Sequence, residues 1–181
     1  YNDYNFQLNG GQEEFQVRLN SGVRDFSIKS DLDYYPSPSH HIKTGLRHTY
    51  HQLTPNIVSA TNGEVEFKSN MTKKFAHESE LYLSDDWKLN SGLSVNYGLR
   101  LSAFVFLGPY KSSLQNIDFE KGQIVKTYFV PEPRFVFNKK LDKKSSLKGG
   151  FTLASQYLHL VSNSGSTLPT DIWVPSTELV K

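Results

Sequence analysis

Cysteine is absent from this chain of 181 residues, so a disulfide framework and a metal site built on thiolates are both excluded. Excess charge of one sign is also missing, because the formal net charge of +2 is too small to indicate a nucleic-acid partner. Long hydrophobic runs are missing too. The longest strictly apolar run is Ala103–Leu107, whereas a transmembrane helix needs about 20 apolar residues. A membrane barrel stays open, since its strands need an apolar residue only at every second position.

The stretch from Leu93 to Leu107 alternates between two kinds of residue almost throughout. Its odd-numbered positions are all apolar, and its even-numbered positions from Ser94 to Ser102 are polar or glycine. A period of two predicts a β-strand. At about 3.4 Å per residue this strand would span roughly 50 Å. A tilted membrane-spanning strand needs only ~9–11 residues, so this strand is long enough to cross a bilayer and project beyond it.

Shorter alternations predict further strands, and no segment has a helical period. The first two predicted strands, Tyr4–Leu8 and Phe15–Leu19, flank a hairpin turn at Asn9–Gly11. The remaining predicted strands are Val23–Tyr35, His41–Leu53, Lys74–Lys88, about Glu132–Lys140, and Ser146–Tyr157.

The connectors between these strands alternate strictly between short and long. The short connectors are Pro36–His40, Leu89–Gly92 and Leu141–Ser145. The long ones are Thr54–Thr72, Gly108–Pro131 and the chain from Leu158 onward. In an antiparallel meander, short turns gather at one end and long loops at the other, which is typical of outer-membrane barrels.

Aromatic and charged residues fit the same interpretation. Tyr34 and Tyr35 precede the first short turn and Trp87 precedes the second, where a membrane interface would place amphipathic rings. Aromatic residues are common in any sheet, so this pattern counts only together with the connectors. Acidic residues between Asp25 and Asp33 share one face, as do basic residues between Lys43 and His51, and the two faces can pair across strands. The polar face is a hydrated lumen in a barrel or the solvent face in a soluble sheet.

Seven short motifs are spread over most of Val23–Lys181. In the C-terminal third they are Glu132–Phe135, Ser145–Gly150, Gln156–Asn163 and Leu168–Pro175; upstream they are Asp33–Pro36, Asp85–Lys88 and Tyr97–Arg100. Together they resemble the barrel of TonB-dependent outer-membrane receptors, particularly the Bacteroidetes-type versions. The Leu168–Pro175 run is the most specific of these motifs.

The resemblance implies a barrel of about 22 strands with a plug in its lumen. It also implies a short N-terminal motif that contacts an energy-transducing periplasmic partner. This chain has no plug, no partner-contact motif and no closing aromatic strand, and it supplies about six to eight strands. Because it begins at Tyr1 without a signal peptide, we expect a piece of a longer protein, with a mature processed chain as the alternative. Such a piece alone would leave two open sheet edges, which cannot face lipid.

The expected fold is therefore all-β, an antiparallel up-and-down meander that forms part of a transmembrane β-barrel, with residues 1–181 as one partial barrel. The resemblance implies a receptor in the bacterial outer membrane for energised uptake of a siderophore, vitamin, glycan or peptide, without enzymatic activity. Its implied partners are outer-membrane lipid, the rest of its own barrel and plug, the inner-membrane TonB complex and, as in some relatives, a surface lipoprotein. Two alternatives remain: a structural barrel subunit of a larger envelope complex, and a secreted soluble β-rich binding module.

Residues suited to chemistry are sparse. His48 and His51 are three apart and point to opposite faces of a strand, so we expect no metal site and no cofactor. Asp85 and Asp86 also face opposite ways and are not an acid–base pair, so no catalytic residue is predicted. Ligand contacts are expected in the long connectors, at Tyr110, Lys111, Gln115, Asn163, Thr170, Asp171 and Trp173.

Overall fold

The computed structural model describes residues 1–12, 15–62, 65–68, 72–112, 116–161 and 172–177. These residues form strands joined by turns and extended segments, which confirms the all-β prediction. No helix long and apolar enough to cross a membrane occurs in the described part of the chain.

The main sheet has eight strands and is antiparallel throughout, in the order β1-β2-β3-β5-β6-β9-β10, with β4 beside β3. Neighbours in the sheet follow chain order, so the predicted up-and-down meander is confirmed. The strands of this sheet are β1 (Asn2–Gln12), β2 (Phe15–Ser37), β3 (His40–Asn62), β4 (Val65–Lys68), β5 (Lys74–Asn90), β6 (Leu93–Leu107), β9 (Ile124–Lys140) and β10 (Ser146–Thr152). Two small hairpins accompany it: β7 (Tyr110–Ser112) with β8 (Ile117–Phe119), and β11 (Leu158–Val161) with β12 (Ile172–Pro175).

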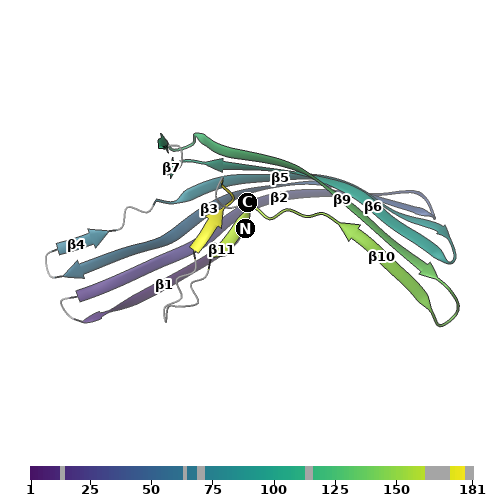
Figure 1. The fold of residues 1–181 in the computed structure, drawn as a ribbon, viewed down its shortest axis with the longest axis horizontal. Helices are drawn as coiled ribbons and strands as arrows, with labels where there is room; N and C mark the ends of the chain where they lie inside the picture. Colours follow the sequence, from purple (N-terminus) through teal and green to yellow (C-terminus); the bar gives the residue numbers. More distant parts are fainter. Residues whose placement is uncertain (13–14, 63–64, 69–71, 113–115, 162–171, 178–181) are drawn as a thin grey trace.

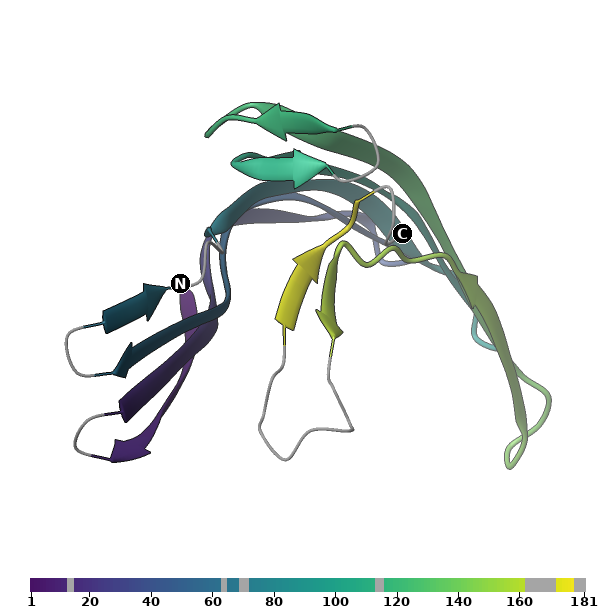
Figure 2. The ribbon, with the colours of Figure 1, turned by 60° about the vertical axis from the view of Figure 1, so that its left-hand side comes forward.

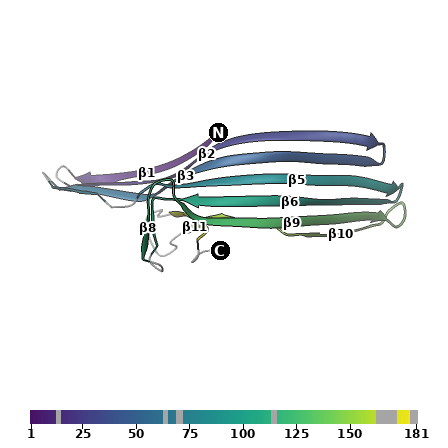
Figure 3. The ribbon, with the colours of Figure 1, turned by 90° about the horizontal axis from the view of Figure 1, so that it is seen from above.

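The main sheet is bent into an open arch (Figures 1 and 2). Seen from above, its strands lie side by side from β1 to β10 (Figure 3). The sheet does not close on itself in the described residues, and β1 and β10 are its outer strands. The β11–β12 hairpin lies beneath the arch, on its concave side (Figure 2).

Residues that pair directly across antiparallel strands point to the same face, so the register assigns every side chain to a side of the arch. Phe104 of β6 stacks on Tyr157, which leads into the β11–β12 hairpin, with ring centroids 5.0 Å apart. The face that carries Phe104 is therefore the concave one. The alternating apolar residues of β6, from Val95 to Val105, point the other way and lie on the convex face.

A small core joins the concave face to the hairpin beneath it. Its buried members are Ala76, Phe104, Phe106 and Tyr157. On the other side of the hairpin, β12 contacts β2 and β3, where Leu19, Val23 and Leu53 are buried. The hairpin therefore fills the concave side toward the long connectors and helps to hold the arch in shape.

The first predicted turn is wrong. Gly10 and Gly11 lie inside β1, opposite Val17 and Gln16, and the connection to β2 falls after Gln12. The predicted strands Phe15–Leu19 and Val23–Tyr35 are one continuous strand, β2, with a register shift between Asn20 and Gly22 in place of a loop. A bulge absorbs the break in alternation while keeping most backbone groups hydrogen-bonded, which a loop would not do.

The three short turns lie where predicted, but the long connectors are partly structured. Thr54–Thr72 contains the C-terminal end of β3 and all of β4. Gly108–Pro131 contains β7, β8 and the beginning of β9. After Leu158, the described residues Leu158–Val161 and Ile172–Pro175 pair as β11 and β12. These segments gain order because neighbouring segments supply cross-strand partners that their own sequence does not reveal.

The last two predicted strands have different limits in the structure. β10 ends at Thr152, because the following chain turns beneath the arch to place Tyr157 in the core. β9 begins at Ile124 and contains Pro131 and Pro133. Proline is tolerated there because β10 pairs with β9 only from Arg134 to Lys140, so the earlier part of β9 is an edge on that side.

Candidate functional site: the concave face

A ladder of charged and hydroxyl side chains covers the concave face of β2, β3 and β5. Near the short turns, Asp31 pairs with Lys29 at 2.5 Å and accepts a hydrogen bond from Tyr82. Farther toward the turn, Asp33 lies 2.5 Å from His41 and 3.9 Å from Lys43. The cross-strand pairing of acidic and basic faces expected from the sequence is thus present, and it extends to a third strand.

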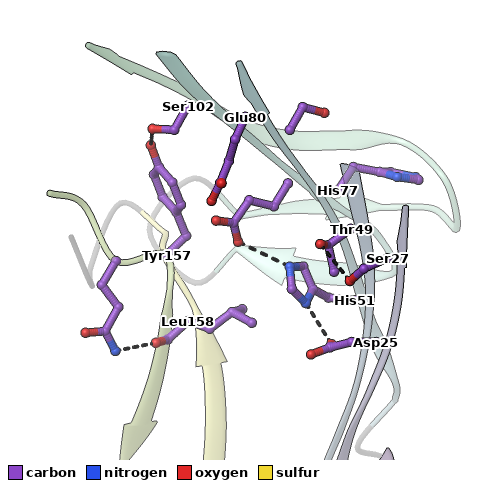
Figure 4. Close-up of polar contacts among 12 residues, drawn as sticks. Asp25, Ser27, Thr49, His51, His77, Glu80, Ser102, Tyr157 and Leu158 are labelled. Carbon is purple, nitrogen blue, oxygen red and sulfur yellow. Dashed lines mark hydrogen bonds and ion pairs between the residues drawn. The ribbon is translucent and has the colours of Figure 1, made fainter. Parts of the chain in front are cut away.

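His51 is a deeply buried ionisable group of this ladder, with 7% of its side chain exposed. Its Nδ1 lies 2.8 Å from Asp25 Oδ1 and its Nε2 lies 3.2 Å from Glu78 Oε2, so the ring bridges β2 and β5 (Figure 4). Burial alone would lower the pKa of His51, but its hydrogen bonds and charge interactions with Glu78 and Asp25 outweigh burial and raise it. An imidazolium between two carboxylates is the arrangement that this site favours.

A second network ties β5, β6 and β9 to the chain beneath the arch. Arg100 Nη2 lies 2.5 Å from Glu132 Oε2, and Arg100 Nη1 lies 3.7 Å from Glu80. Glu132 Oε1 accepts hydrogen bonds from Ser102 Oγ at 3.1 Å and from the Ser155 amide at 3.0 Å. Ser102 Oγ also lies 2.6 Å from the Tyr157 hydroxyl (Figure 4). The same carboxylate therefore fixes both the sheet and the segment that leads into β11.

A pocket of about 820 Å³ lies at the short-turn end of the arch. It is lined by side chains from five strands or their turns, among them Tyr35, His41, Asp86, Asn96 and Asn138. The Oδ1 atoms of Asn96 and Asn138 are buried and have no hydrogen-bond partner among the described residues. Buried acceptors without a donor are costly, so a segment or ligand that donates hydrogen bonds would be stabilised in this pocket.

The described residues among those predicted to contact a ligand lie on two different hairpins. Tyr110 is in β7, half-buried, with its ring edge-to-face against Phe106 at 5.2 Å and Lys74 Nζ 5.6 Å from its centroid. Lys111 is exposed and lies 3.7 Å from Asp118. Trp173 is in β12, opposite Leu160. The other four predicted residues lie outside the described residues: Gln115, Asn163, Thr170 and Asp171.

Sequence reasoning missed Glu78, Glu80 and Glu132 as members of the concave networks. The first two share one face of β5 by simple alternation, and that signal was available in the sequence. From the sequence, Glu132 stands out only as part of a motif, because its partners Arg100 and Ser155 lie 32 and 23 residues away in the chain. Within the described residues, no group of three His, Cys, Asp or Glu side chains is arranged to hold a metal ion.

The convex face carries two rows of aromatic rings, of which the sequence predicted Tyr34 and Trp87. Tyr35 was predicted with them but stacks on His41 and lines the pocket instead. Ring contacts run from Tyr1 across β2, β3 and β5 at the end nearer the long connectors: Tyr1 to Phe26 at 5.1 Å, Phe26 to Tyr50 at 6.5 Å, and Tyr50 to His77 at 5.0 Å. We call this the long-connector row. A short-turn row lies at the other end of the same face and contains Tyr34, Trp87, Tyr97, Phe135 and Phe137.

No family model, curated protein or solved structure matches this chain.

Proposed function

We propose that these strands form part of the wall of an outer-membrane receptor barrel, which takes up a scarce nutrient with energy from an inner-membrane TonB complex. One observation carries the proposal: an apolar band lies exposed on the convex face between the two aromatic rows. The nutrient classes expected from the sequence motifs are a siderophore, a vitamin, a glycan or a peptide. Capture and passage of such a solute change no covalent bond, so the proposed function is not enzymatic.

The apolar band consists of large side chains that no described element covers. Ile28 and Leu32 of β2 are 67% and 62% exposed, and Leu81 and Leu83 of β5 are 55% and 57% exposed. The band continues through Leu46, Leu99 and Phe129. A contiguous apolar surface of this kind marks contact with a partner or with lipid.

The height of the band suits a bilayer. Phe26 in the long-connector row and Tyr34 in the short-turn row are eight residues apart on β2, or about 27 Å at 3.4 Å per residue. A tilt of about 40° reduces this to roughly 21 Å along the membrane normal, close to the ~25 Å apolar band of outer-membrane barrels. Aromatic rows at both edges of such a band are the usual interfacial arrangement.

The concave face and the sheet edges support the same proposal. Charged ladders on the concave side would line a hydrated interior, while lipid contacts the opposite face. The unpaired backbone groups of the outer strands β1 and β10 need partners in lipid, which further strands of the barrel would supply. The unpaired acceptors of Asn96 and Asn138 suit contact with a polar plug segment. The β11–β12 hairpin, which carries Trp173, would face a solute or a surface lipoprotein that approaches from the long-connector end.

The test is the electrophoretic mobility of the full-length protein, extracted from outer membranes in detergent and run with and without boiling. A heat-dependent shift, together with nutrient-limited growth that requires both this protein and the TonB complex, would support the proposal. A heat shift without any uptake defect would favour the structural barrel subunit. Recovery in the soluble fraction without a shift would refute the membrane assignment and favour the secreted binding module.

A further inference from the structure

We propose that His48 and His77 form a binding site for a divalent first-row transition-metal ion on the convex face. The two side chains come from neighbouring strands, β3 and β5. His48 is paired with Ser79 and His77 with Tyr50, so the histidines are diagonal neighbours on one face. Figure 4 shows His77 on the opposite side of the sheet from His51, which separates this pair from the carboxylates of the concave network.

The distances between the two rings match those of two ligands on one ion. His48 Nε2 lies 3.2 Å from His77 Nδ1, and the ring centroids are 5.2 Å apart. Two imidazole nitrogens bound tetrahedrally at 2.0–2.1 Å would lie about 3.3 Å apart, with centroids about 5.2 Å apart. A straight N–H···N hydrogen bond of the observed length would place the centroids farther apart, at about 5.5 Å. The two distances are therefore those expected if both nitrogens bind one ion.

The far nitrogen of His48 is also held as in a metal site. His48 Nδ1 lies 2.9 Å from Ser79 Oγ. A metal-bound histidine almost always donates its other N–H to such a partner, which fixes its tautomer and its orientation. With Nδ1–H directed at Ser79, the Nε2 lone pair is free to bind a cation.

The surroundings decide which ions the site takes. His77 belongs to the long-connector row and His48 pairs with Ile28 one step inside it, so in the proposed barrel the two rings lie at the membrane–water boundary. His48 is exposed there, so interfacial water or an external ligand can complete the coordination sphere. Neither a thiolate nor a third ligand of the His, Asp or Glu type completes the group within the described residues. Imidazole suits Cu²⁺, Ni²⁺ and Zn²⁺, and the usual order of affinities places Cu²⁺ first. The site does not depend on the proposed transport function, because it requires only the β3–β5 register.

The experiment measures Cu²⁺ binding to the purified full-length protein by isothermal titration and by electron paramagnetic resonance. The variants are H48Q, H77Q and S79A, with H159Q as the matched control, because His159 lies apart on β11 and bonds to Ser176. We expect Cu²⁺ affinity to fall by more than about 10-fold in both H48Q and H77Q, since loss of an outer-shell partner alone costs 10–100-fold. S79A removes only the outer-shell partner, so its Cu²⁺ affinity should fall by about 10–100-fold, and by no more than in H48Q or H77Q. The Cu²⁺ affinity of H159Q should match that of the wild type.

Circular dichroism of each variant would show that the sheet is retained, as expected for substitutions at the surface. Wild-type spectra should show coupling of the unpaired electron to two nitrogens, and each single variant should lose this pattern. Absence of Cu²⁺ binding by the wild type, or an affinity in H48Q and H77Q equal to that of the wild type, would refute the site and leave the pair as a hydrogen bond.

Discussion

Replacing Leu81 by arginine distinguishes a lipid-facing band from a water-facing one. Leu81 lies in the middle of the apolar band on β5, is 55% exposed, and is flanked across the strands by Leu46 and Leu101. In a bilayer, arginine at this depth should cost about 2–4 kcal/mol of folding free energy. In water, the same substitution on an open surface should stay within about 0.5 kcal/mol of zero, because little is buried there.

Leu89 supplies the matched control on the same strand. It is 40% exposed and lies beside a short turn, beyond the short-turn row. Arginine there should cost only about 0–1 kcal/mol, because the penalty falls toward the membrane interface. Leu99→Arg, in the band on β6, should behave like Leu81→Arg.

The assay is reversible guanidinium unfolding of the full-length protein in lipid vesicles, followed by tryptophan fluorescence. Separate heat-shift gels report the folded fraction of each variant. A Leu81→Arg cost equal to that of Leu89→Arg would refute the reasoning, because depth in a bilayer is the only physical difference that we assign to these positions.

Three further predictions concern the concave face and a turn. Because the folded-state pKa of His51 is raised, its stabilising effect is fully present below the unfolded value of 6.5 and is lost as pH rises through the folded value. Denaturant midpoints should therefore fall for the wild type across that window and stay flat for H51Q. Tyr157→Phe removes the hydroxyl that meets Ser102 and should cost about 0.5–1.5 kcal/mol of unfolding free energy, with faster proteolysis of the β11–β12 hairpin as a second readout. Asp142 accepts hydrogen bonds from the Lys144 and Ser145 amides, which lower its pKa, so Asp142→Ala should lower the unfolding midpoint at pH 7. That difference should vanish as pH falls below 3.8 and through the lowered folded-state pKa.

The strands that sequence reasoning placed well are those whose alternation is unbroken. β6 has the predicted limits, Leu93–Leu107, and β5 extends the predicted Lys74–Lys88 by only two residues. Prediction failed where alternation breaks but pairing continues, as at Asn20–Gly22 of β2, because a bulge and a loop leave similar traces in a sequence. It failed again after Thr152, where tertiary packing of Tyr157 ends the strand.

The candidate site shows the same division. The sequence predicts ligand contacts at Tyr110 and Trp173 because both lie in long connectors, whereas the structure puts them on separate hairpins. The opposite orientations predicted for His48 and His51 are confirmed by their partners: His48 meets Ser79 and His77, whereas His51 meets Asp25 and Glu78. The partners themselves could not be predicted, because each lies on another strand and the sequence alone does not determine the register between strands.

By itself, the sequence determined the period of two, the all-β class, the three short turns and the separation of apolar from polar faces. These follow from local geometry, because successive side chains of a strand must point to opposite sides. Tertiary structure alone decided the strand register, the curvature of the arch, the return of β11 and β12 beneath it, and the meeting of His48 with His77. Each of these depends on hydrogen bonds and packing between residues far apart in the chain, whose free energy no local pattern encodes.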